Sequence, residues 1–447
     1  MIGTVRKLTW RRSLMALAAG LLALSTLSVG SAQQGEIPLN PEVSGDVEFW
    51  HFWGSPVRRN AIRRVVAQCQ AELPNITVTE TFKPWGDIWT ANIAAVAARS
   101  GMPDVIVADR LQLPRDAADG IYQSLGDMVE ADNIQSSAFW DFTWQQTLYE
   151  GESYGLPFET DVRVLFYNKN VLEEAGLDPE NPPATWEELW AAADALDVKN
   201  EDGTFERIAF FPLYGNVGVD LWAMANGHEF VVDGQPVVDD PAVAETLEWM
   251  KRWIDRYGGW SEVQRFLAQY GAAPNDAFMA GGVVMKVDTA GYNSILNFYR
   301  PKANLADGST PNMDWGVSLP PYEVEPATWS GGFTLSIPSG AENPEAAWEF
   351  IKCAASRPGQ VSWARDTYSI PSDIAAARDP VLMADPAWGF FIDAMEVGKL
   401  VPFVPAYSNW IEQLNSRLES VWTDATTIEE ALSEAQQEID RTIEQNR

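Results

Sequence analysis

Apolar residues recur along the first third of the chain in two alternating spacings. Residues 47–52, 75–83 and 104–108 are short runs rich in β-branched and aromatic side chains, which is typical of buried strands. Residues 57–73 and 85–99, which lie between these runs, carry apolar side chains three and four positions apart, as the buried face of a helix does. Strands that alternate with helices predict a β-α-β-α-β unit, whose parallel sheet is covered by helices on both faces.

The rest of the chain extends this pattern and predicts an α/β fold throughout. Further strands are expected at 162–167, 208–213, 283–287 and 333–337, and further helices at 170–175, 220–226, 241–257, 275–280 and from 427 to about 445. Two helix starts carry a capping box, in which Thr185 pairs with Glu188 and Thr427 pairs with Glu430.

Length and composition add the number of domains to this picture. At 447 residues the chain exceeds one ordinary domain, so two lobes are expected. Hydrophobic residues make up 46% of the chain and include 20 Trp, which is enough to build a substantial core in each lobe.

The charge of the chain is unevenly distributed. The formal net charge is -32 at pH 7, yet residues 1–32 contain four basic residues and no acidic one. Basic residues, a short apolar stretch and small residues up to Ala32 predict a signal peptide at 1–32, cleaved after about Ala32. Both the general and the twin-arginine export routes fit, and either makes the protein periplasmic. The acidic remainder repels phosphate backbones, so no nucleic acid partner is expected.

Cys69 and Cys353 are the two cysteines of the chain, and each falls on the apolar stripe of a predicted helix. One interpretation is that both are small buried hydrophobes with free thiols. In an oxidising compartment, an even number of cysteines equally predicts a disulfide. Both alternatives stay open, because the separation of the two Cα atoms decides between them.

A stretch in the middle of the chain carries a family resemblance. It runs from Pro157 through Tyr167-Asn168-Lys169 and Ala175-Gly176-Leu177 to Thr185-Trp186-Glu187-Glu188-Leu189. These motifs, in this order, resemble the extracellular solute-binding proteins that supply sugar ABC importers, the group that contains the maltose-binding protein. The similarity extends more thinly from about Val47 to Ile443.

The resemblance implies a two-lobed periplasmic binding protein of type II, in which each lobe is a mixed sheet flanked by helices. In this family the chain crosses a hinge three times, and by position the crossings would fall near Pro157, near 325–329 and near 368–371. The N-terminal lobe would hold residues 33–156 and 327–370, and the C-terminal lobe residues 157–326 and 371–447. Ligands of such sheets bind beyond the carboxyl ends of the strands.

Residues suited to a sugar gather at the predicted strand ends and crossings. A sugar packs its C–H face on aromatic rings, while its hydroxyl groups pair with carboxylates, amides and arginine. The ring-bearing candidates at these places are His51, Trp53, Trp85, Trp222, Tyr292, Trp329, Tyr407 and Trp410. A core or surface aromatic is the alternative for each of them, because large aromatic side chains are mostly buried for packing.

The polar candidates come from the resemblance. Asp109 and Arg110 follow the third predicted strand, where the maltose-binding proteins have an Asp-Arg pair that grips sugar hydroxyls, although this chain lacks the aromatic before the pair. Asp161 is similar in position to a family carboxylate, and Glu159 would share its face of an extended chain. Gly331-Gly332 resembles a glycine pair where backbone meets ligand. The alternatives are a salt bridge, an exposed hinge carboxylate and a simple bend.

The expected function is that of a monomeric receptor that closes two lobes around a neutral sugar and presents it to the permease subunits of an ABC importer. No cofactor, metal or catalysis is expected, since neither His51 nor His228 has a partner at metal-ligand spacing. A second hypothesis is a receptor for a charged solute, such as glycerol phosphate or a polyamine. A third is a glycoside-processing enzyme with Glu159 and Asp161 as its paired carboxylates.

Overall fold

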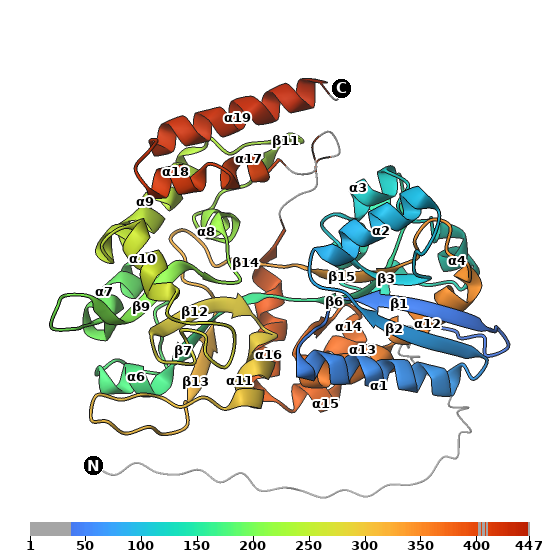
Figure 1. Ribbon diagram of the computed structural model, residues 1–447, viewed down its shortest axis with the longest axis horizontal. Coiled ribbons are helices and arrows are strands. Elements are labelled where there is room, and N and C mark those ends of the chain that lie inside the picture. Colours follow the sequence, from blue (N-terminus) through green and yellow to red (C-terminus); the bar gives the residue numbers. More distant parts are fainter. Residues whose placement is uncertain (1–36, 401–403, 405–406, 408–409, 446–447) are drawn as a thin grey trace, which may run out of the picture. The chain divides into compact units, whose positions relative to one another are not determined.

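The predicted β-α-β-α-β unit forms one half of a six-stranded sheet. The computed structural model describes residues 37–400, 404, 407 and 410–445, so the expected signal peptide lies outside the described residues. Strand β1 (Gly45–His51) pairs in parallel with β2 (Ile76–Phe82) and with β3 (Val105–Asp109). Helices α1 (Pro56–Glu72) and α2 (Asp87–Ala98) connect these strands and cover opposite faces of the sheet (Figure 1).

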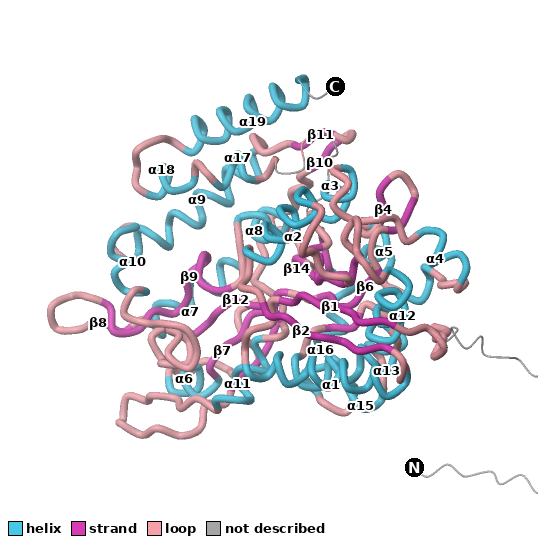
Figure 2. The backbone as a smooth tube through the Cα atoms, turned by 45° about the vertical axis from the view of Figure 1, so that its right-hand side comes forward, coloured by secondary structure: helices cyan, strands magenta, loops and turns pink. Residues whose placement is uncertain are grey.

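Three antiparallel pairings complete this sheet. Strand β15 (Gly332–Ser336) pairs with β3, β6 (Leu156–Thr160) pairs with β15, and β16 (Ile370–Pro371) pairs with β6. The resulting order is β16-β6-β15-β3-β1-β2, so the sheet is mixed. Helices α12 (Pro344–Ala355) and α13 (Arg357–Thr367) pack beside α1 on one face (Figure 2).

A second, five-stranded sheet has helices on both of its faces. Its order is β13 (Trp315–Ser318), β7 (Arg163–Asn168), β12 (Val283–Thr289), β9 (Phe205–Gly215) and β8 (Val198–Lys199). In β7, Val164 and Phe166 join one buried cluster, whereas Leu165 and Tyr167 join another on the opposite face. Since both faces are buried, the strand is apolar without alternation.

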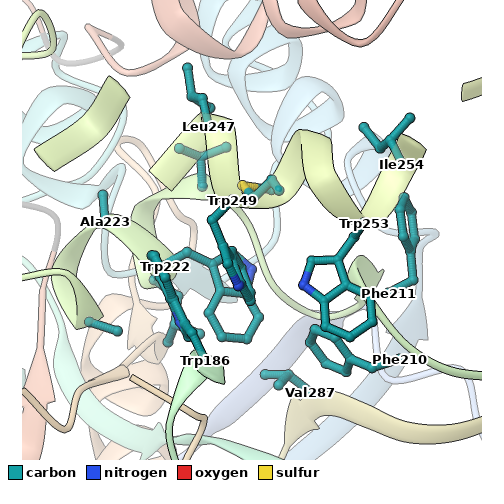
Figure 3. Packing of buried hydrophobic residues seen from close by; sticks show 14 of the residues in the cluster. Trp186, Phe210, Phe211, Trp222, Ala223, Leu247, Trp249, Trp253, Ile254 and Val287 are labelled. Atoms are coloured by element: carbon teal, nitrogen blue, oxygen red, sulfur yellow. The ribbon is translucent and has the colours of Figure 1, made fainter. Parts of the chain in front are cut away.

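The core on one face of the second sheet is built largely from tryptophan. Trp186 of α7 (Trp186–Leu196) stacks on Trp249 of α9 (Pro241–Arg256), with ring centroids 4.1 Å apart. Trp222 of α8 (Val219–Ala225) and Trp253 of α9 lie next to this pair (Figure 3). All four side chains are buried, so they contribute to stability through the large apolar area that each removes from water.

The remaining elements are helices around the two sheets, most of them short, and three small strand pairs. The helices are α3 (Leu113–Ala118), α4 (Gly126–Ala131), η1 (Ser136–Ala138), α5 (Asp141–Gln145), α6 (Lys169–Glu174), α10 (Trp260–Leu267), α11 (Tyr292–Tyr299), α14 (Ile374–Ala377), α15 (Pro380–Met383), α16 (Pro386–Ala394), η2 (Met395–Val397), α17 (Glu412–Asn415), α18 (Leu418–Trp422) and α19 (Ile428–Gln445). The pairs are β4 (Leu148–Tyr149) with β5 (Glu152–Ser153), β10 (Val231–Val232) with β11 (Gln235–Pro236), and β14 (Thr328–Trp329) with β17 (Gly398–Lys399). Within the described part of the chain, no helix combines the length and apolarity needed to cross a membrane.

Local signals of the sequence are mostly confirmed. The capping box of Thr185 and Glu188 opens α7, and Thr427 and Glu430 exchange the corresponding hydrogen bonds, each 3.1 Å long, before α19. Residues 275–280 form turns instead of the expected short helix, because glycine and proline around them leave too few residues for a helical turn to continue.

The chain passes from the six-stranded to the five-stranded sheet at Asp161 and Val162, between β6 and β7. This crossing lies a few residues after the expected one at Pro157, which is itself inside β6. Helices α14 and α15, which were expected in the C-terminal lobe, contact α13, which lies beside the six-stranded sheet. The assignment of residues to two lobes stays a prediction.

Of the two alternatives for the cysteines, the disulfide is present. It joins Cys69 of α1 to Cys353 of α12, with their Cα atoms 5.7 Å apart and a sequence separation of 284. A cross-link between residues so distant in sequence restricts the unfolded chain strongly, which stabilises the folded state relative to it.

Replacing both cysteines by alanine (C69A/C353A) is expected to lower the free energy of unfolding by about 3 kcal/mol, because the unfolded chain regains its conformational freedom. Guanidinium chloride unfolding of the oxidised wild type and of the double variant measures this difference. Dithiothreitol serves as the control: it should destabilise the wild type and leave the double variant unchanged. A wild type whose unfolding midpoint does not move on reduction contradicts the prediction.

Candidate functional site

A cavity of about 380 Å³ lies at the carboxyl ends of β3 and β6, beside the crossing from β6 to β7. Segments after β1, β9 and β12 complete its wall, so that residues from both sheets face one space. Its lining consists of Phe52, Arg58, Trp85, Asp109, Leu111, Glu159, Thr160, Asp161, Arg163, Asn216, Thr289, Gly291, Trp329, Gly331, Gly332, Phe333 and Ser369. This is the edge at which open α/β sheets bind ligands.

Two carboxyl groups of the cavity resist ionisation. Burial raises the pKa of Asp109 to about 6, although the backbone N–H of Leu111, 2.9 Å from the carboxylate, and the charge of Arg110 oppose this rise. Burial also raises the pKa of Glu159, whose carboxylate accepts a hydrogen bond of 2.5 Å from Nε1 of Trp363. Both groups therefore carry a desolvation cost that a ligand hydroxyl could reduce by donating to them.

Arg163, the first residue of β7, holds the centre of the site. Its guanidinium donates to Oδ1 of Asp161 at 2.5 Å and to the side-chain oxygen of Asn216 at 2.8 Å. The same group lies over the indole ring of Trp329, 3.6 Å from the ring centroid. Burial lowers the pKa of Arg163, and the nearby charge of Asp161 opposes that change. The cation is thus compensated by the protein before any ligand arrives.

Asp161 ties two distant segments of the chain together at this point. Its Oδ1 accepts from Arg163 and also from the backbone N–H of Gly331, 2.8 Å away. Its backbone oxygen accepts from the hydroxyl of Ser330 at 2.9 Å. The crossing after β6 is therefore bonded to the segment between β14 and β15.

The two glycines of that segment are required by close approach. Gly332 has φ +136°, and a Cβ atom there would lie 2.3 Å from the backbone oxygen of Glu159. A Cβ atom on Gly331 would lie 3.2 Å from both the indole of Trp329 and the guanidinium of Arg163. Only glycine allows these groups to meet without displacement.

Arg110 lies behind the wall of the cavity and is not among the residues that line it. Its side chain is fully buried, donates to the hydroxyl of Thr160 at 3.1 Å and bonds the backbone oxygen of Gly331. Burial lowers its pKa to about 10, which still leaves it charged at neutral pH. The structure thus gives Arg110 a positioning role, in which it fixes the glycine segment from behind.

Three aromatic side chains, Phe52, Trp85 and Phe333, form another part of the wall. Trp85 is 61% exposed, which is unusual for tryptophan, and its ring meets Phe52 edge to face at 4.9 Å between centroids. Phe333 meets the same indole edge to face at 5.9 Å. The packed neighbours hold Trp85 in place while its exposed surface remains free for contact.

Seven of the expected site residues line the cavity, and the other seven do not. Those that the fold brings together are Trp85, Asp109, Glu159, Asp161, Trp329, Gly331 and Gly332. Besides Arg110, those that lie outside it are His51, Trp53, Trp222, Tyr292, Tyr407 and Trp410.

His51 and Trp53 are core residues of the first half of the molecule. Their rings are stacked 5.6 Å apart, and Trp53 also packs against Trp363 at 4.3 Å. Burial lowers the pKa of His51 to about 4, so the ring is neutral under ordinary conditions. Both were expected at the site because they lie at the end of the first strand, yet both side chains are buried and pack against Phe49 of β1.

The remaining four aromatic residues belong to the hydrophobic clusters that cover the five-stranded sheet. Trp222 is fully buried among the core tryptophans (Figure 3), and its Nε1 donates to the backbone oxygen of Pro212 at 2.8 Å. Tyr292 donates to the carboxylate of Asp276 at 2.8 Å. Trp410 is buried in the same core as Trp222, and the partly buried Tyr407 packs against that core.

The expected set omits several residues that line the cavity, among them Arg58, Arg163 and Asn216. Arg163 stands in an otherwise apolar strand, and Arg58 lies in the first turn of α1. Asn216 follows β9 in a loop. A charged residue inside the buried run of β7 was the one signal that pointed to Arg163, because a buried charge requires a partner.

A larger hollow of about 580 Å³ lies between the segment that joins β8 to β9 and the helices α9 and α10. Its arginines are paired locally, since Arg256 bonds Asp197 at 2.7 Å and Arg265 bonds Glu262. Size alone therefore does not identify the binding site, whereas the cavity at the crossing combines aromatic surface with buried carboxyl groups.

Comparison with known proteins agrees with the resemblance found in the sequence. The family described as bacterial extracellular solute-binding protein matches residues 64–390. The maltotriose-binding protein of Pyrococcus abyssi is 24% identical over 407 residues, which is 89% of this chain and 82% of that protein. The sn-glycerol-3-phosphate-binding periplasmic protein of Shigella dysenteriae is 27% identical over 171 residues, which is 37% of each chain.

The fold is also found among solved structures. The structure of CpMnBP1 with mannotriose bound superposes with a TM-score of 0.78 at 26% identity and covers 88% of this chain and 99% of that one. Together with the maltose-bound MalE3 of T. maritima (TM-score 0.71, 20% identity, covering 89% of this chain and 99% of that one), it confirms the expected maltose-binding-protein-like fold of type II.

Asp109→Asn is expected to stabilise the ligand-free protein at neutral pH. The pKa of Asp109 is about 6 in the folded state and 3.8 in the unfolded state. The folded state therefore binds the proton more tightly, and the stability that this adds is fully present below about pH 4 and is lost as pH rises through 6. The neutral amide avoids this loss and keeps an oxygen for the N–H of Leu111. The free energy of unfolding should rise by about 1 to 3 kcal/mol at pH 7.5 and change little near pH 4. Urea unfolding at both pH values measures it; an equal difference at both contradicts the assignment.

Proposed function

This chain belongs to the family of bacterial extracellular solute-binding proteins, and on that premise we propose that it captures a neutral carbohydrate and delivers it to a sugar ABC importer. The observation that carries the proposal is the composition of the cavity at the crossing. Indole surface of Trp85 and Trp329 faces the same space as the carboxyl groups of Asp109 and Asp161. Aromatic faces suit the C–H side of a sugar, and carboxylates accept from its hydroxyls.

The balance of charge in the cavity supports a neutral ligand. Arg163 is already paired with Asp161, and the pKa of Asp109 and of Glu159 is raised by burial. A strong excess of one sign would favour an ion of the opposite sign, whereas these groups offer many donors and acceptors with little net charge. We expect the receptor to be a periplasmic monomer, to close on its ligand and to dock on the permease subunits.

A solute that carries a phosphate is the second candidate, and Arg58 favours it. This side chain lines the cavity, and its charge opposes the rise in the pKa of Glu159. A phosphate would compete with Glu159 for Arg58. The two candidates differ in their response to salt, because affinity for an anion falls as ionic strength rises, whereas affinity for a neutral sugar changes little.

Catalysis is not part of the proposal. Asp161 is held by Arg163 and by Gly331, and Glu159 is held by Trp363. A pair of glycosidase carboxyl groups must be free to give and take protons or to attack the sugar. Both groups are instead engaged in contacts that shape the wall.

We predict that a screen of neutral monosaccharides, disaccharides and acyclic polyols by thermal shift contains at least one ligand that raises Tm. Asp109→Ala and Trp329→Ala should each weaken binding of that ligand by about tenfold or more, since each removes a contact of the cavity without replacing it. Isothermal titration calorimetry measures the loss.

Two control variants separate binding from folding. Asp307→Ala changes an exposed loop carboxylate, and Tyr407→Phe removes a hydroxyl that lies outside the cavity. Both should bind as the wild type does. If Asp109→Ala and Trp329→Ala also bind with unchanged affinity, the cavity is not the ligand site.

A further inference from the structure

A second cavity adjoins the first and shares part of its wall. It has a volume of about 330 Å³ and is lined by residues 215–218, Asp220 and Leu221 together with Arg163 and Trp329. Arg163, Asn216 and Trp329 line both cavities. The two spaces therefore meet at the indole of Trp329 and the guanidinium that covers it.

The second cavity has the polar groups that hydroxyls require. Asp220 faces it, and burial raises the pKa of this carboxyl group while the charge of Arg163 opposes the rise. Asn216 is exposed; its side-chain oxygen accepts from Arg163, and its amide nitrogen donates to no described residue. One carboxyl group thus faces a space outside the first cavity, and one amide lies where the two cavities meet.

Glycine keeps this second space open. Gly218 precedes α8, and a Cβ atom on it would lie 2.6 Å from the carboxylate of Asp220. Gly215 has φ +118°, and a Cβ atom there would lie 1.9 Å from the backbone oxygen of Val287. A larger residue at position 215 would displace the backbone of the segment that forms the floor, and one at position 218 would displace the carboxylate of Asp220.

Trp329 offers a further contact at the junction. Its Nε1 is buried and has no hydrogen-bond partner among the described residues, which is a cost that ligand binding could remove. Each cavity alone lies at the lower end of the range of about 300 to 1,000 Å³ for small-molecule sites. Together they offer space for a ligand longer than one sugar ring.

We propose that the ligand is an oligosaccharide of at least two units, with one unit in each cavity and Trp329 between them. This inference rests on the proposed function, and it adds that Asp220, which lines the second cavity and not the first, determines the preference for chain length. A monosaccharide in the first cavity would leave Asp220 without a ligand contact.

The experiment uses two series of probes, one built from mannose and one from glucose, and each series contains the monosaccharide, the disaccharide and the trisaccharide. Binding is measured by calorimetry on residues 33–447. In the series that binds, the disaccharide should bind about tenfold or more tightly than the monosaccharide. Val217→Trp, which fills the second cavity, should remove this advantage and leave monosaccharide affinity within about twofold.

Two further variants provide a conservative substitution and a matched control. Asp220→Asn preserves the shape of the cavity and should weaken the disaccharide more than the monosaccharide, so it carries the test if Val217→Trp does not fold. Val232→Trp, at a side chain that is 48% exposed on β10, is the matched control and should bind every probe as the wild type does.

The outcomes distinguish this inference from the proposed function. Equal affinity for monosaccharide and disaccharide, with neither Val217→Trp nor Asp220→Asn changing their ratio, overturns the inference and leaves a receptor for single sugars. If neither these probes nor the wider panel of neutral sugars and polyols binds, the proposed function fails and the inference fails with it.

Discussion

The site depends on one ion pair at the crossing between the two sheets, in which a buried arginine meets a partly buried carboxylate. Arg163 and Asp161 are two residues apart, and each is also bonded to a segment distant in sequence: Arg163 to Asn216, and Asp161 to Gly331. A buried charge without partners would cost several kcal/mol, so the guanidinium holds its neighbours in one arrangement. The pair therefore fixes where the crossing, the glycine segment and the loop after β9 lie relative to one another.

Contacts behind the cavity wall also hold the segment between β14 and β15. Arg110 is fully buried and bonds Thr160 and the backbone of Gly331 from behind the cavity. Gly332 allows two backbone segments to approach closely enough for this to occur. The segment between β14 and β15 is thus held from both sides, by Asp161 on the cavity face and by Arg110 on the core face, so its backbone groups are engaged by the protein and it contributes shape to the site.

The sequence predicted the fold better than the site, and the reason lies in what each depends on. Strands and helices follow from local periodicity, and the residues that the resemblance pointed to include Asp109, Asp161 and the glycine pair, which line the cavity. Aromatic residues were less predictable, because the buried Trp53 and Trp222 are the same residue type as Trp85 and Trp329 and were likewise expected near strand ends or crossings. Whether an indole faces a core or a cleft depends on packing between elements far apart in sequence. Carboxylates are more informative, since they rarely enter a core without a functional or structural partner.

The cost of the site is offset elsewhere in the molecule. Burial raises the pKa of Asp109 and Glu159 and lowers the pKa of Arg110 and Arg163. The folded protein thus removes four ionisable groups from the water that would stabilise their charged forms. The stacked tryptophans beside the five-stranded sheet and the disulfide between α1 and α12 do not line the cavity, and they provide stability that does not depend on ligand. Because a ligand that supplies hydroxyl donors and acceptors lowers the desolvation cost of the same groups, binding energy and the relief of that cost are coupled. This coupling explains why a receptor gains from partly buried, incompletely satisfied polar groups that a purely structural interior would exclude.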